Sequence, residues 1–190
     1  MLNPDLHPRR LGGWPRMALL ALALPLIAAC SPALNWRETH PKGIDILMNF
    51  PCKPQQITQN VQLAGDTVKM SMTGCTTDAM TFALAHAALK DESQVGPALA
   101  VLHQEAVHNV AGTVTRSQPS AVDHAASSLP NALDMDISGQ SPTGKPLRER
   151  VVLFAQGSQI YQATAFAHAK DYKPEAAQIF STSIRLSNGH

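Results

Sequence analysis

Two histidines and a glutamate lie close together in the segment 103–108 (HQEAVH) and could in principle bind zinc. Metalloprotease helices carry two histidines four residues apart, so that both face one metal ion, with a glutamate directly after the first. Here His103 and His108 are five residues apart, and Glu105 is two residues after His103. At about 100° per residue the two imidazole rings diverge by roughly 140° around a helix. We therefore expect ordinary helix-surface histidines and no metal site.

A second group has the soft ligands that a copper-binding protein would use. It consists of Met70, Met72, Met80 and His86. The methionines continue alternating apolar runs, and methionine fills irregular gaps in protein cores well. We expect core packing for these methionines, and we predict no cofactor.

Two pairs of charged side chains form the third candidate. Asp134 and Asp136 are two residues apart in a strand pattern, so both side chains point to one face of that strand. Arg148 and Arg150 share a face in the same way. The aspartates fit either a cation site or the solvated outer face of a sheet. We favour the solvated face, with cross-strand ion pairs to the arginines where the two strands are neighbours.

Signatures of catalysis are missing from the sequence. It has no Gly-rich phosphate loop and no Gly-x-Ser-x-Gly nucleophile motif. The serines near His124, namely Ser120, Ser127 and Ser128, lie in a stretch of low complexity that we interpret as a loop. We predict no catalytic residue and do not expect an enzyme.

Cys52 and Cys75 lie on either side of a hairpin-like pattern. In an oxidising compartment we expect them to form a disulfide. Such a bond would close a loop of roughly two dozen residues and stabilise the domain by about 3 kcal/mol. Two free thiols or a metal-binding pair are the alternatives.

The first 30 residues have the order of a secretory signal. Three positive charges, Arg9, Arg10 and Arg16, precede the uncharged apolar run 17–29. A membrane-spanning helix needs about 20 apolar residues, so this run is too short to be one. Its length and its small final residues fit a cleaved signal peptide over 1–29.

The end of this signal, segment 27–30 (IAAC), resembles the lipobox of bacterial lipoproteins. The resemblance implies cleavage between Ala29 and Cys30 and attachment of a diacylglycerol to the sulfur of Cys30. An uncleaved anchor, or an ordinary signal with a chance cysteine, is the alternative. Ser31 follows the cysteine. By resemblance to the sorting rule of enteric-type bacteria, a serine there favours the outer membrane.

Removal of residues 1–29 leaves 161 of the 190 residues, which suits one domain. The 15 basic and 14 acidic residues of the whole chain become 12 and 13, because three arginines and one aspartate leave with the signal. This near-neutral balance of charges does not indicate binding of nucleic acid, which usually requires an excess of positive charge. We predict a lipidated N-terminus and tether at 30–43, followed by a single globular domain at 44–190.

Apolar residues alternate in several segments and predict strands there. The segments are 44–50, 57–63, 68–72, 80–84, 132–137, 147–155 and 160–166. Helical spacing predicts a helix over 95–110, and Pro174 opens a second, short helix. The segment 113–128 has no clear pattern. Four successive strands with short turns favour antiparallel pairing, so we expect an α+β fold, an antiparallel β-sheet with helices packed on it.

Three local segments and the order of these elements resemble the PsbP-like fold family. The segments are 50–54 (FPCKP), 157–162 (GSQIYQ) and 179–186 (IFSTSIRL), and the likeness extends over residues 44–186. The family includes a photosystem II extrinsic subunit and a eukaryotic Ran-binding import factor, but the chain is more similar to bacterial lipoproteins of this fold. The resemblance implies an α-β-α sandwich that serves as a binding or assembly module without catalysis. No partner-contacting residue of the family can be matched, and a photosynthetic role is not implied.

The expected function follows from the predicted cellular location and from the fold. We expect a lipid-anchored protein of the cell envelope that faces the periplasm, and an interaction module whose partner is another envelope protein. The alternative is a periplasmic carrier of a small ligand or a metal. Its pocket would lie between sheet and helix, with His86 or His168 near the mouth.

Overall fold

A computed structural model of the protein describes residues 34–126 and 128–186. Within these ranges no helix is both long and apolar enough to cross a membrane. The helices are a short 3₁₀ turn (Glu92–Gln94), α1 (Val95–Asn109) and α2 (Pro174–Thr182). The strands are β1 (Arg37–Thr39), β2 (Ile46–Phe50), β3 (Gln55–Leu63), β4 (Asp66–Thr77), β5 (Met80–Ala88), β6 (Thr113–Pro119), β7 (Leu133–Gln140), β8 (Pro146–Gln156), β9 (Gln159–His168) and β10 (Arg185–Leu186).

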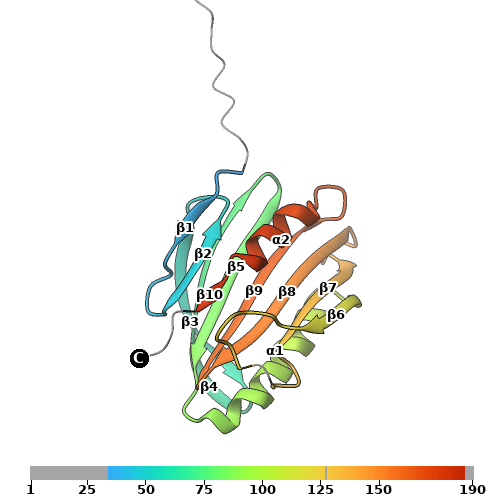
Figure 1. The fold of residues 1–190 in the computed structure, drawn as a ribbon. Helices are drawn as coiled ribbons and strands as arrows, with labels where there is room; N and C mark the ends of the chain where they lie inside the picture. The colour runs from blue at the N-terminus through green and yellow to red at the C-terminus, as the bar shows by residue number, and fades with distance from the viewer. Residues whose placement is uncertain (1–33, 127, 187–190) are drawn as a thin grey trace, which may run out of the picture. The chain divides into compact units, whose positions relative to one another are not determined.

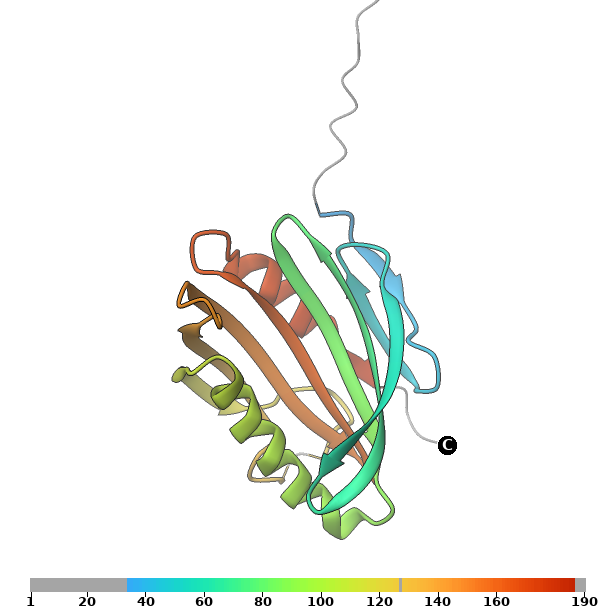
Figure 2. The ribbon, with the colours of Figure 1, turned by 180° about the vertical axis from the view of Figure 1, so that it is seen from behind.

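Seven of these strands form one large antiparallel sheet in the order β3-β4-β5-β9-β8-β7-β6. Strands β1, β2 and β10 form a small second sheet. The small sheet and α2 lie on one face of the large sheet (Figure 1), which we call the α2 face. Helix α1 lies on the opposite face (Figure 2), the α1 face. The α+β class with an antiparallel sheet is confirmed, and the sheet dominates the fold.

The core of the α2 face is built from aromatic side chains of all three parts. Phe82 of β5 contacts Phe180 of α2 with ring centroids 5.4 Å apart, and Phe180 contacts Phe50 of β2 at 5.2 Å. All three rings are at most 1% exposed. Burial of each such side chain contributes about 1.5–3 kcal/mol. The core therefore joins the small sheet and α2 to the large sheet.

The core of the α1 face is aliphatic. Val95, Leu99 and Leu102 of α1 are buried against the large sheet, where they meet side chains such as Val151 and Leu153 of β8. Their spacing in the sequence is the helical spacing from which the helix was predicted, and the helix is confirmed.

The structure differs from the sequence expectations in four places. Strand β2, expected to pair with the strand that follows it, pairs instead with β1 and β10 in the small sheet. Strand β6 occupies the first part of the segment 113–128 that had no clear pattern. Strand β1 lies inside the predicted tether, where Trp36 packs edge-on against Phe82 with ring centroids 6.0 Å apart. Met72, expected in the core, is 37% exposed. Helix α1 crosses one end of the large sheet and leaves the other end of β3 and β4 uncovered (Figure 2).

Candidate functional site

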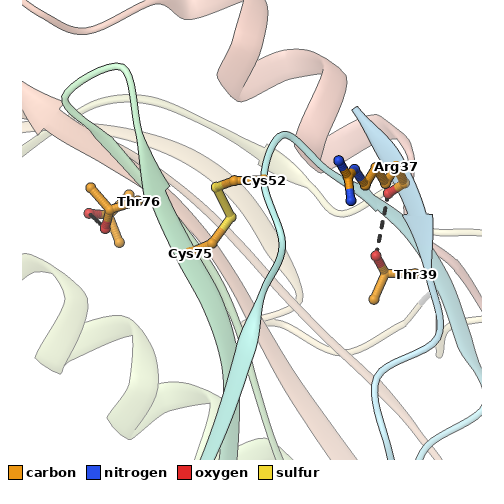
Figure 3. The surroundings of a disulfide bond; sticks show 6 residues. Arg37, Thr39, Cys52, Cys75 and Thr76 are labelled. Atoms are coloured by element: carbon orange, nitrogen blue, oxygen red, sulfur yellow. Dashed lines mark hydrogen bonds between the residues drawn. A yellow bond between two sulfur atoms is a disulfide. The ribbon is translucent and has the colours of Figure 1, made fainter. Parts of the chain in front are cut away.

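A disulfide joins Cys52 to Cys75, as the sequence predicts. The two residues are 23 positions apart in the sequence, and their Cα atoms are 6.0 Å apart. Figure 3 shows the bond crossing from the segment after β2 to β4. The half-buried Cys75 packs against the core of the α2 face. The bond therefore has a structural role, because it fixes the segment that follows β2 to strand β4 of the large sheet.

Five charged side chains gather where β6, β7 and β8 lie side by side. Asp136 of β7 pairs in register with Arg150 of β8 on one side and with Arg116 of β6 on the other. Asp134 and Arg148 are two residues away from these positions and so share the same face. The two predicted charged pairs are thus on neighbouring strands, and the expected cross-strand ion pair is confirmed for Arg150 with Asp134 but not for Arg148.

Asp134 is the centre of this cluster. Arg150 donates two hydrogen bonds to its carboxylate, from Nε to Oδ1 at 3.0 Å and from Nη2 to Oδ2 at 2.7 Å. Arg116 bridges both aspartates, with Nη2 at 2.9 Å from Oδ1 of Asp134 and Nε at 2.6 Å from Oδ2 of Asp136. The side chains of Asp134 and Arg150 are only 11% and 14% exposed. These bonds are charge-assisted, and those between Asp134 and Arg150 are largely shielded from water, so together they hold the three strands in register.

A cleft of about 460 Å³ lies beside this cluster, between the large sheet and α2. Cavities of roughly 300–1,000 Å³ are typical of small-ligand sites. We call it the arginine cleft; the lining residues that matter for its chemistry are Arg116, Asp136, Arg148, Arg150, Tyr172 and Gln178.

Arg148 differs from the other two arginines of the cleft. It is exposed, and within the described residues its guanidinium makes no hydrogen bond or ion pair, whereas Arg116 and Arg150 are both engaged by aspartates. Three guanidinium groups face two carboxylates, so the cluster keeps one excess positive charge. Arg148 is the group on which that charge is available to a ligand.

Tyr172 supplies a neutral hydroxyl to the same cleft. Burial raises the pKa of Tyr172 to about 12, and the nearby charge of Asp136 acts in the same direction, against the opposing effect of the three arginines. The phenol therefore stays protonated at physiological pH and can donate a hydrogen bond. A free guanidinium and a hydroxyl donor that line one cleft suit an oxyanion such as a carboxylate or a phosphate.

Glu149 is a buried carboxyl group that the sequence analysis did not single out. It is 7% exposed and is paired in register with Ile137 and Phe166 of the neighbouring strands. Its Oε2 has no hydrogen-bond partner in the described part of the chain. Burial raises the pKa of Glu149 to about 7. A hint of this position was present in the sequence, since Glu149 is two residues before Val151 and so shares the face of β8 that forms the core of the α1 face.

The two histidines considered for a ligand pocket do not line the arginine cleft. His86 is 9% exposed in β5, next to Tyr161 at a ring-centroid distance of 6.4 Å, and burial lowers its pKa. His168 lines a separate hollow of about 430 Å³ with Pro146 and Lys170. The expectation that either histidine lies near the mouth of the pocket between sheet and helix is wrong for this cleft.

The remaining candidate residues lie apart from it. His103 and His108, on the C-terminal half of α1, border an open surface hollow. In residues 34–126 and 128–186, no three His, Cys, Asp or Glu side chains lie close enough together to hold a metal ion. His124 lies in the segment between β6 and β7.

The predicted lipid site lies outside the described residues, and so do its cleavage site and Ser127. The implied cleavage between Ala29 and Cys30, and the lipid on Cys30, stay predictions.

Comparisons with known proteins give little further guidance. No protein-family model matches the chain, and no curated protein matches it. A solved structure with partial similarity is PA94 from Pseudomonas aeruginosa, a protein of unknown function. It is 12% identical, with a TM-score of 0.34 over 72% of this chain and 85% of that chain. A likeness this distant assigns neither a fold family nor a function.

Proposed function

We propose that this protein is a lipid-anchored, non-catalytic binding protein of the cell envelope, and that its arginine cleft binds an anionic group of a small ligand. The observation that supports this most directly is the exposed, unpaired guanidinium of Arg148 in a cleft that the protonated Tyr172 also lines. A guanidinium offers a planar fork of donors that matches a carboxylate or a phosphate.

The sequence favours an interaction module and leaves a ligand carrier as the alternative. The cleft favours the carrier, because its volume is in the range of small-molecule sites and its arginines suit an anionic ligand. The position of Gln178 on α2 supports this choice, since its amide can bond a part of the ligand that the sheet does not reach. An interaction with another envelope protein remains the second candidate.

The envelope location rests on the lipobox-like segment before Cys30. The Cys52–Cys75 bond agrees with it, because disulfides persist in oxidising compartments such as the periplasm. One acyl chain anchors a protein only marginally, while two or three chains hold it stably. We expect cells fed labelled palmitate to label this protein, and Cys30→Ser to move it from the membrane fraction to the soluble fraction. An unlabelled protein, or a Cys30→Ser variant that sediments as before, would contradict the anchor.

We also propose that the domain has the PsbP-like α-β-α arrangement. Its support is an antiparallel sheet with α1 on one face, and with the C-terminal α2 on the other. This assignment is consistent with a binding role, but the cleft proposal does not depend on it.

The cleft proposal is tested by titration calorimetry at low ionic strength with succinate, benzoate and inorganic phosphate as probes. We expect at least one probe to bind, and Arg148→Gln to weaken it by about tenfold or more, since a hydrogen-bonded charge contributes about 1.5–3 kcal/mol. Lys145→Gln is the matched control, because Lys145 is an exposed cation on the same β7–β8 hairpin but outside the cleft. No binding of any probe, or equal affinities for the two variants, would refute the proposal.

A further inference from the structure

Strand β3 is an edge strand of the large sheet, and its own residues have none of the features that protect an edge from pairing. It is nine residues long and pairs with β4 in an unbroken register. Gln55 to Asn60 are all exposed, and the whole strand (QQITQNVQL) has no charged residue and no proline. Natural edge strands are usually short, bulged, charged or interrupted by proline, because an open edge is a template for another strand.

The opposite edge of the same sheet shows the contrast. Strand β6 ends at Pro119, its register with β7 shifts between Val114 and Arg116, and Arg116 places a charge on it. This edge therefore has three of the usual protective features. Strand β3 has none of them, so the two edges of one sheet are not equivalent.

An apolar patch lies next to the open edge. Ile57 of β3 is paired in register with Met72 of β4, so the two side chains are neighbours on one face. They are 59% and 37% exposed and rank among the most exposed large apolar side chains in the described residues. Helix α1 does not cover this end of the sheet (Figure 2).

The residues of β3 are arranged almost symmetrically about Gln59. When the strand is laid antiparallel against its own copy with Gln59 opposite Gln59, Ile57 falls opposite Val61 twice. β-Branched side chains pack well against their cross-strand neighbours, and this pairing would bury apolar surface of both residues. On the other face only uncharged polar residues meet, so no like charges oppose. The polar pairs are Gln56 with Gln62 and Thr58 with Asn60.

We propose that β3 is a self-association edge: two copies of this chain pair through antiparallel β3 strands about a two-fold axis at Gln59 and join their large sheets into one. A two-fold interface uses the same patch on both subunits, and a nearly palindromic strand meets this requirement with one sequence. An extended segment of another protein could also add to an open edge, but it would place no demand on the symmetry of β3. The symmetry therefore favours a second copy.

The experiment uses the full chain, purified from membranes in mild detergent, with single cysteine substitutions in β3. In the proposed pairing two copies of residue 59 have Cα atoms about 5 Å apart. Two copies of residue 55 lie eight strand positions apart, about 26 Å at 3.3 Å per residue. We expect Gln59→Cys to give a covalent dimer under mild oxidation. Gln55→Cys, an equally exposed position on the same strand, should stay monomeric on the same non-reducing gel.

A second variant tests the free association without a cross-link. Gln59→Lys places two ammonium groups opposite each other, and we expect it to raise the dimer dissociation constant in sedimentation by about tenfold. The far-UV circular dichroism of this variant should be unchanged, because Gln59 is exposed. A wild-type chain that is monomeric at all concentrations would overturn the proposal. Equal cross-linking of the two cysteine variants would overturn the register, and with it the two-fold axis at Gln59.

Discussion

Replacing the buried carboxyl of Glu149 by an amide should change how stability depends on pH. The pKa of Glu149 is raised from its usual 4.5 to about 7, because burial penalises the charged form. The folded protein therefore favours the protonated carboxyl. The stability that depends on this proton is fully present below about pH 4.5 and is lost as the pH rises through 7.

The size of the effect follows from the same two values. A difference of 2.5 between 4.5 and about 7 corresponds to roughly 3 kcal/mol over the full range. Between about pH 5 and about pH 8, the free energy of unfolding of the wild-type protein should fall by about 2.5 kcal/mol more than that of Glu149→Gln. The absolute stability of the variant is a weaker test, because an amide in the same place also lacks partners for its polar atoms.

Urea unfolding of both proteins at several pH values measures this difference. The comparison must be between the two proteins, because burial lowers the pKa of His86 and so makes the folded state less stable as the pH falls. Both proteins contain His86, so its effect cancels in the difference. Glu105→Gln is the matched control, since Glu105 is exposed on α1 and its removal should leave the pH dependence unchanged.

Parallel pH profiles for wild type and Glu149→Gln would refute this reasoning. They would mean that the ionised carboxylate finds water or a partner at no cost, and hence that Glu149 is not held in an apolar site. A Glu105→Gln profile that deviates as strongly as that of Glu149→Gln would also refute it, because the effect would then not depend on burial.

Three other changes test the parts of the fold that position the cleft. Phe180→Ala removes the ring that joins α2 to both sheets, and we expect it to lower the free energy of unfolding by about 3–5 kcal/mol in urea; a loss below 1 kcal/mol would contradict the core described above. Replacing Cys52 and Cys75 together by alanine should cost about 3 kcal/mol in the same assay, and the variant should no longer respond to reducing agent. Asp134→Ala leaves the largely buried guanidinium of Arg150 without its carboxylate, and should cost about 3–5 kcal/mol; Asp136→Ala removes a more exposed carboxylate and should cost clearly less, and equal losses would argue against this difference in burial.

Alternation of apolar residues predicts most of the strands because one face of each is buried. In β5, Met80, Phe82 and Leu84 are all completely buried, and they are the residues on which the prediction rested. The same reasoning places Met72 in the core, where it is not. Alternation shows which side chains share a face, but it does not show how far along the sheet the covering helix extends.

Strand β6 was not predicted for a different reason. Its side chains are exposed or half-buried throughout, so it has no apolar pattern to recognise. It is held by its backbone pairing with β7 and by the hydrogen bonds from Arg116 to Asp134 and Asp136. Such contacts join residues about 20 positions apart, and only the folded chain brings them together.

Of the residues that line the cleft, the sequence predicts only some of those that the large sheet contributes. The shared faces of Asp134 with Asp136 and of Arg148 with Arg150 follow from spacing alone. Tyr172 lies in the segment that leads from β9 back over the sheet into α2, and the path of that segment is not visible in the sequence. The sequence therefore could not place the hydroxyl of Tyr172 in the arginine cleft.

The positive charge of the cleft depends on the strand that the sequence did not reveal. Strands β7 and β8 alone contribute two aspartates and two arginines, which could pair one to one and leave nothing for a ligand. Strand β6 adds Arg116, and this third guanidinium binds Asp136 and shares Asp134 with Arg150. Both carboxylates are then bound by Arg116 and Arg150, and Arg148, which lies opposite Ser138, makes no ion pair with either of them. An edge strand with little buried surface thus determines the charge of the site as well as its wall.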